Sequence, residues 1–215
     1  LHSLSGSGAW GALLTGTIIF GLGGWQWAAL LLAFFISSSA LTRLFGKRKA
    51  SLDEKFEKGG RRDLSQVLVN GGVAALFAGL HYFLPSAGWT WMGFVASLAA
   101  VNADTWATEL GVLNPSPPRL ITSWKEVERG TSGGISLFGT LAAVLGALFI
   151  ALFGAVLAIS AAGLAGRFWI DLQIFTVAGL AGALFDSLLG ATVQAIYRCP
   201  QCGKETEKHP LHTCG

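Results

Sequence analysis

Acidic side chains set within long apolar runs are the residues best able to do chemistry in this chain. Asp104 and Glu109 lie in the largely apolar segment 91–113, together with an asparagine and two threonines, and Asp186 lies in the largely apolar segment 172–197. An ionisable side chain inside a membrane span is costly to bury and indicates a functional site. Such carboxylates, together with phosphate oxygens, are typical ligands of Mg²⁺. We therefore predict a catalytic Mg²⁺ site on these three acids, with pairing to Lys or Arg, or a proton relay, as the alternatives.

The spacing of the acids predicts that they act from two helices. On an ideal helix, Asp104 and Glu109 point about 140° apart, so one helix would not direct both carboxylates at the same ion. Asp186 is the candidate contribution from a second helix. Gly182 and Gly190, one turn to either side of Asp186, would let that helix approach its neighbour closely.

Two polar segments carry residue types that bind phosphate groups. In the first, a pair of arginines precedes two amides that share a helix face at a spacing of four residues. In the second, a glycine-rich turn leads into a helix, whose N-terminal N–H groups and dipole attract anions. This turn lacks the residue order of a Walker A loop, and ordinary helix caps are the alternative for both segments. The predicted nucleotide- or phosphate-binding residues are Arg61, Arg62, Gln66, Asn70, Asn102, Lys125, Arg129, Gly130, Thr131, Ser132 and Gly133.

All three cysteines lie close to the end of the chain. Cys199 and Cys202 form a Cys-x2-Cys pair, and His212 and Cys214 follow as a His-x-Cys pair. This pattern is typical of a zinc site with three cysteines and one histidine. We predict that residues 199–215 form a short tail closed by structural zinc, beside a membrane domain of residues 1–198.

The composition predicts the elements that position these residues. Hydrophobic residues make up 52% of the 215 residues and charged residues 13%, which indicates a polytopic membrane protein. Six apolar segments approach the roughly 20 residues that a helix needs to cross a bilayer. The alternation of apolar and polar residues that marks a membrane β-barrel is absent from these segments. We predict an all-α bundle of about six transmembrane helices at 9–23, 26–45, 67–84, 91–113, 134–160 and 172–197, of which the first is short and could be tilted or re-entrant.

The basic residues are sorted to one side of this bundle. If the spans alternate in direction, the segments 43–63 and 114–133 and the tail after 197 share a side and hold every Lys and Arg except Arg167. The positive-inside rule places that side in the cytoplasm. Both ends of the chain and the predicted site are therefore expected on the cytoplasmic face of a prokaryotic cell membrane.

Three ordered motifs, at 102–111, 129–134 and 186–191, resemble the phytyl-phosphate kinase family of integral membrane proteins. The resemblance implies transfer of a phosphoryl group from a nucleoside triphosphate, with CTP favoured, to an isoprenoid monophosphate of the phytyl or geranylgeranyl type, which gives the diphosphate. It also implies functional roles for the three acids and for the loop residues Arg62, Lys125, Arg129 and Thr131.

Two other functions stay open on the sequence alone. A nucleotidyltransferase acting on a lipid phosphate would use the same acids and the same phosphate-binding residues. A carrier of anionic lipids would use the acids for protons or cations. Such carriers often contain inverted repeats, and the only sign of one is the weak similarity between Asp104-Thr105 and Asp186-Ser187. The expected partners are a lipid from the bilayer and a nucleoside triphosphate, with no nucleic acid, and the glycine-rich spans permit a homodimer.

Overall fold

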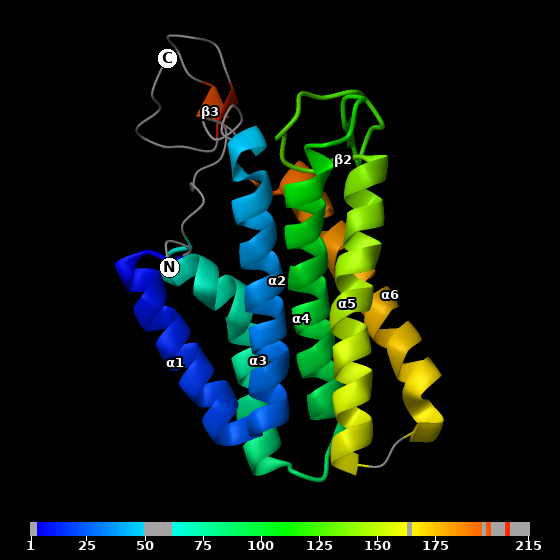
Figure 1. The fold of residues 1–215 in the computed structure, drawn as a ribbon. Helices are drawn as coiled ribbons and strands as arrows, with labels where there is room; N and C mark the ends of the chain where they lie inside the picture. Colours follow the sequence, from blue (N-terminus) through cyan, green and yellow to red (C-terminus); the bar gives the residue numbers. More distant parts are fainter. Residues whose placement is uncertain (1–3, 50–61, 163–164, 195–196, 199–204, 207–215) are drawn as a thin grey trace.

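The computed structural model describes residues 4–49, 62–162, 165–194, 197–198 and 205–206. Within these residues the chain is all-α apart from two short two-stranded ladders, which confirms the predicted fold class. Figure 1 shows the long helices packed side by side along the height of the molecule. Their bounds are α1 (Gly6–Gly23), α2 (Trp25–Lys49), α3 (Leu64–Phe83), α4 (Gly88–Gly111), α5 (Leu137–Ala162) and α6 (Phe168–Thr192), and a single 3-10 turn, η1 (Ala165–Arg167), precedes α6.

Each predicted span corresponds to one of these helices, with the ends shifted by a few residues. Four helices of the described chain are long and apolar enough to cross a membrane, at Trp25–Phe45, Leu64–Phe83, Leu137–Ile159 and Phe168–Thr192. The predicted spans 9–23 and 91–113 are helices in the structure, α1 and α4. By length and composition alone, however, neither of these two helices is among the four that could cross a membrane. For α4 the reason is the polar stretch at its C-terminal end.

The central helix is α4, which packs against α2, α3, α5 and α6. Its buried residues include Phe94 and Leu98 and also the polar Asn102 and Glu109. A helix enclosed by other helices can carry polar side chains in a membrane, because those side chains meet protein partners instead of lipid. The enclosure of α4 therefore explains how this helix can carry Asn102 and Glu109.

Small residues bring α4, α5 and α6 into direct contact. A methyl group added at Gly179 of α6 would lie 2.7 Å from the Cβ of Ala147 in α5 and 2.9 Å from the Cβ of Ala99 in α4. One added at Gly182 would lie 2.5 Å from the Cβ of Ala100. Apolar burial drives little association between helices inside a bilayer, so close packing of this kind is a main source of stability there.

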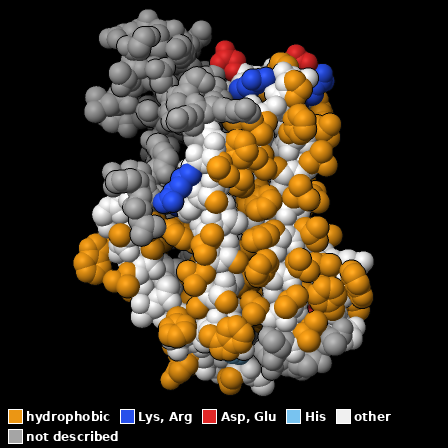
Figure 2. Space-filling view, viewed as in Figure 1, with side chains coloured by type: hydrophobic (Ala, Val, Ile, Leu, Met, Phe, Trp, Pro, Cys, Tyr) orange, Lys and Arg blue, Asp and Glu red, His pale blue; other side chains and the backbone are white. Residues whose placement is uncertain are grey.

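The connection between α4 and α5 is the longest one described, and it forms a folded loop of residues 112–136 at one end of the bundle. Its strands β1 (Arg119–Leu120) and β2 (Gly134–Ile135) pair antiparallel, with Arg119 opposite Ile135 and Leu120 opposite Gly134. Figure 2 shows charged side chains gathered at this end and hydrophobic side chains over the helices below it. Farther along the chain, β3 (Tyr197–Arg198) pairs with β4 (Glu205–Thr206).

Candidate functional site

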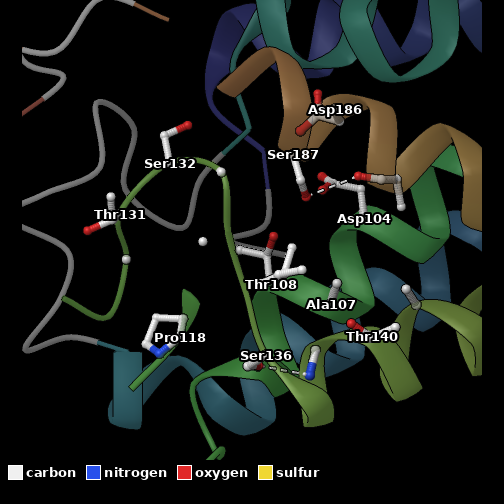
Figure 3. Close-up of a pocket in the computed structure, with 18 of the residues that line it drawn as sticks. Asp104, Ala107, Thr108, Pro118, Thr131, Ser132, Ser136, Thr140, Asp186 and Ser187 are labelled. Atoms are coloured by element: carbon white, nitrogen blue, oxygen red, sulfur yellow. Dashed lines mark hydrogen bonds between the residues drawn. The ribbon is translucent and has the colours of Figure 1, made fainter. Parts of the chain in front are cut away.

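A pocket of about 330 Å³ lies where α4, α5 and α6 meet the loop 112–136. Asp104 and Thr108 line it from α4, and Asp186 and Ser187 line it from α6. Figure 3 shows these side chains around one hollow, with the loop passing across from them. The structure thus brings together Asp104 and Asp186, the two acids that the sequence analysis assigned to different helices.

The pocket-facing side of α4 follows a regular helical spacing. Asp104, Thr108 and Gly111 are four and three residues apart, which places them on one face, and all three line the pocket. At Gly111 α4 lies close to α5, because a Cβ there would be 3.5 Å from the Cα of Gly139. The face of α4 that carries Asp104 therefore also packs against the start of α5.

The glycine-rich turn forms the wall of the pocket opposite the acids. Gly130 and Gly133 have φ angles of 82° and 75°, which side chains with a Cβ rarely adopt. The Ser132 hydroxyl donates a hydrogen bond to Oε1 of Gln194, just beyond α6. A Cβ at Gly133 would lie 2.4 Å from the Cβ of Ala191. The turn is therefore fastened to the C-terminal end of α6, close to Asp186.

The start of α5 differs from the sequence expectation. Gly134 belongs to strand β2, and the residue that caps α5 is Ser136, whose Oγ accepts a hydrogen bond from Gly139 N–H at 3.1 Å. The turn therefore does not stand at the N-terminus of α5, so both the prediction that it leads directly into a helix and the alternative that it caps this helix are wrong. The strand forms because the loop folds back on β1 before the helix begins. Ser136 and Thr140 of the first turn of α5 also line the pocket.

Of the two basic loop residues predicted to bind phosphate, Arg129 lies at the pocket and Lys125 lies away from it. Arg129 lines the pocket, and its Nη2 donates to the backbone oxygens of Asn114 at 2.9 Å and Pro115 at 2.8 Å. Lys125 is exposed and lies outside the pocket lining. Arg129 therefore joins the two ends of the loop while it brings a positive charge to the pocket.

A second polar face of α4 points away from the pocket. Glu109 is only 6% exposed, and its Oε1 accepts a hydrogen bond from Oγ1 of Thr42 in α2 at 3.1 Å. Asn102 is buried; its Nδ2 donates to the Gly146 oxygen in α5 at 2.8 Å, and its Oδ1 accepts from Oγ of Ser37 in α2 at 3.1 Å. These side chains tie α4 to α2 and α5.

The three predicted Mg²⁺ ligands therefore do not form one cluster. Asp104 and Asp186 share the pocket, whereas Glu109 lies on the other face of α4, as its angular offset from Asp104 requires. Among the described residues, no group of three or more His, Cys, Asp and Glu side chains is close enough to hold a metal ion. The structure likewise leaves Asn102 out of the pocket.

The arginine–amide segment also lies outside the pocket. The Arg62 guanidinium carbon is 5.7 Å from the centroid of the Phe34 ring, within the range of a cation–π contact. Burial lowers the pKa of Arg62, and the nearby Glu109 carboxylate opposes this shift because it favours the charged guanidinium. Nη1 of Arg62 and Oε1 of Gln66 are buried, with no hydrogen-bond partner in the described part of the chain.

The remaining predicted residues are placed as follows. Asn70, one turn after Gln66 in α3, is half-buried and does not line the pocket. Arg61 and the predicted zinc ligands Cys199, Cys202, His212 and Cys214 lie outside the described residues, so their roles stay predictions.

The sequence analysis did not assign five hydroxyl-bearing residues of the pocket, namely Thr108, Ser116, Ser136, Thr140 and Ser187. Thr108 lies one turn after Asp104, and Ser187 directly follows Asp186, so helical spacing could have found both. Ser136 stands immediately before an apolar run, which is the usual sequence position of a helix cap. Thr140 follows Ser136 by four residues and had no signal beyond that spacing.

A family profile described as integral membrane protein DUF92 matches residues 1–214, which is nearly the whole chain. This protein belongs to the DUF92 family. The membership confirms the resemblance to a family of integral membrane proteins that the motifs indicated.

Relatives of this DUF92 protein occur in a plant and in an archaeon. Protein PGR of Arabidopsis thaliana is 37% identical over 211 residues, which cover 89% of this chain and 72% of the relative. An uncharacterized membrane protein of Methanocaldococcus jannaschii is 40% identical over 193 residues, covering 87% and 74%. Protein VTE6, chloroplastic, of Arabidopsis thaliana is 32% identical over 158 residues, covering 72% and 47%. No solved structure matches the chain.

Proposed function

We propose that this DUF92 protein is a membrane-embedded kinase. It transfers a phosphoryl group from a nucleoside triphosphate, with CTP favoured, to an isoprenoid monophosphate of the phytyl or geranylgeranyl type. The observation that carries this proposal is the pocket in which Asp104 and Asp186 face the Gly130–Gly134 turn. Further support comes from the resemblance of the same motifs to the phytyl-phosphate kinase family.

The position of the pocket suits one lipid substrate and one soluble substrate. Asp186 lies six residues before the end of α6, about 9 Å from that end at 1.5 Å per residue. The loop above it belongs to the charged end of the bundle. A lipid phosphate anchored in the bilayer and a nucleotide from the aqueous phase would meet at this depth, which we assign to the cytoplasmic side.

The chain's own groups fit the demands of phosphoryl transfer. This reaction depends mainly on positioning and on neutralisation of charge, with little covalent chemistry for the protein to perform. Arg129 supplies positive charge, and the hydroxyls of Thr108 and Thr131 supply hydrogen-bond donors along the pocket. Because the acceptor is already an anionic phosphate, a strong general base is not required.

The donor set of the pocket fits Mg²⁺. Two carboxylates and several hydroxyls are the hard oxygen ligands that this ion prefers, and one or two protein carboxylates suffice when substrate phosphates complete the coordination. Asp104 and Asp186 would hold the ion. When bound, Mg²⁺ neutralises negative charge on the transferring phosphates.

The test is to incubate the detergent-purified protein with Mg²⁺, phytyl or geranylgeranyl monophosphate, and CTP, ATP or GTP in separate reactions. Mass spectrometry of the lipid then identifies the product. We expect a prenyl diphosphate together with the matching nucleoside diphosphate. A nucleotide-capped lipid with pyrophosphate would replace this proposal by nucleotidyl transfer. No lipid product with any of the three nucleotides would contradict both activities and favour a carrier.

A further inference from the structure

We propose that the pocket encloses only the phosphate head and the first part of the acceptor, while the rest of the tail leaves between α5 and α6 into the bilayer. The protein then accepts prenyl chains of different lengths. This inference rests on the proposed function, because it assumes that a prenyl monophosphate binds beside Asp104 and Asp186. It adds the route of the tail and the residues that line this route.

The pocket has a closed floor. Ala143 and Ala183 line its lower part, and with Ala103 and Ala147 they form a packed cluster in which no side chain is more than 5% exposed. Directly below, α4, α5 and α6 are in contact around Gly179, where even a methyl group would lie within 3 Å of two neighbours. A tail therefore has no path along the axis of the bundle.

One residue of the pocket lining, Leu184, lies on an exposed side of α6. Leu184 shares one helix face with Val177 and Leu188, because the spacings are seven and four residues. Val177 is 67% exposed and Leu188 is 40% exposed, so this face of α6 is directed to lipid. Leu184 nevertheless lines the pocket. The edge of the pocket therefore reaches the lipid-facing surface of the bundle at Leu184.

The polarity of the residues that line the pocket also changes from one side of the pocket to the other. Asp104, Thr108 and Asp186 lie where α4 faces α6, and they provide the polar side. Toward α5 the lining becomes less polar with depth, from Ser136 and Thr140 at the start of the helix to Ala143, and Leu184 of α6 adds an apolar side chain. A phosphate directed to the first side leaves its hydrocarbon tail on the second, where the bilayer begins.

The size of the pocket leads to the same conclusion. Its volume of about 330 Å³ is near the lower end of the roughly 300–1,000 Å³ that small-molecule sites occupy. The phosphates of two substrates have to share this space. A long tail therefore stays in the bilayer, where lipid chains are as apolar as leucine side chains and added carbons gain nothing from the protein.

The experiment measures binding and does not depend on turnover. The intact chain in detergent is titrated with isoprenoid monophosphates of 5, 10, 15 and 20 carbons in the presence of Mg²⁺, at defined mole fractions in the micelle, and half-maximal thermal stabilisation gives the affinity. We expect the affinities for 10, 15 and 20 carbons to agree within about threefold. A steep optimum at one length, a cut-off above one length, or no binding of any of the four would overturn the inference.

Two matched variants test the side opening. Leu184→Trp narrows the opening, whereas Val177→Trp places the same ring on the same lipid-facing face two turns away. We expect Leu184→Trp to weaken binding of the 20-carbon phosphate at least tenfold and to leave the affinity for the 5-carbon phosphate almost unchanged. Val177→Trp should change neither affinity. Equal affinities of the two variants for the 20-carbon phosphate would contradict the proposed route. Equal binding of the longer chains without any diphosphate product would instead leave this inference standing and reject the kinase.

Discussion

The two polar faces of α4 use similar residues for different purposes. One face carries Asp104 and Thr108 and borders a hollow that a ligand can enter. The other carries Asn102 and Glu109, which are buried and make hydrogen bonds to α2 and α5. Polar residues in a membrane helix therefore divide into those that hold the bundle together and those that a ligand can reach. The direction of each side chain decides between the two roles.

The largest difference between the faces is expected in activity. Asp104→Asn and Glu109→Gln both replace a carboxylate by an amide of the same shape. We expect Asp104→Asn to lower kcat/KM on the order of 10²–10³-fold, as the loss of one group that stabilises transition-state charge does, and to leave the thermal unfolding temperature unchanged. Glu109→Gln should change kcat/KM only a few-fold. Rates of prenyl diphosphate formation and melting curves of both variants measure this, and equal losses of activity would erase the distinction between the faces.

The next largest effect is expected on the free energy of unfolding when charged residues at the second face, which carries Glu109, are replaced. Arg62 is half-buried, and the Glu109 carboxylate favours its charged form, which opposes the lowering of the Arg62 pKa by burial. Removing one charge of such a couple leaves the other buried and less compensated, so Arg62→Met and Glu109→Gln should each lower the free energy of unfolding by about 1–3 kcal/mol. The double variant should lose clearly less than the sum, which a double-mutant cycle in a denaturing-detergent titration measures. Strictly additive losses would mean that Arg62 and Glu109 do not support each other.

A smaller loss of stability is expected where α4 meets α6 below the pocket. A Cβ at Gly182 would lie 2.5 Å from the Cβ of Ala100, whereas one at Gly16 of α1 has no heavy atom within 4 Å. Gly182→Ala should therefore destabilise the protein by about 1–3 kcal/mol through overpacking, and Gly16→Ala should have no destabilising effect. Melting curves of both variants test this, and an unchanged curve for Gly182→Ala would mean that the helices separate there without cost.

The smallest effect is expected for a single anchoring amide. Asn102→Ala removes the hydrogen bonds to Gly146 and Ser37, and hydrogen bonds between membrane helices contribute about 0.6 kcal/mol each on average. We expect a loss of about 1 kcal/mol in the free energy of unfolding. Ser97→Ala, which removes only a bond to the Phe94 oxygen within α4, is the control. Ser97→Ala should lower the free energy of unfolding less than Asn102→Ala does. Equal losses for the two variants would show that the hydrogen bonds of Asn102 to other helices add no stability.

The sequence was sufficient for several features because their physical causes are local. Long apolar segments have to be helices in a bilayer, since every backbone polar group needs a partner within the segment, and each of the six predicted segments is a helix. The angular offset between Asp104 and Glu109 follows from helix geometry alone, and the structure separates the two side chains accordingly. The need for a second helix near Asp104 followed from the same offset.

Only the tertiary structure decided which polar residues meet. Residue types gave no reason to separate Asn102 and Gln66 from the phosphate-binding set, because an amide that ties two helices together looks the same in sequence as one that binds a ligand. The contact of the Ser132–Gly133 turn with the end of α6 joins residues that are some sixty positions apart in the sequence. The sequence by itself therefore determined the helices and the faces of each helix, whose geometry is set within a few residues. The packing of α4 against its neighbours determined which face became the pocket, because that choice depends on which helix comes to lie opposite.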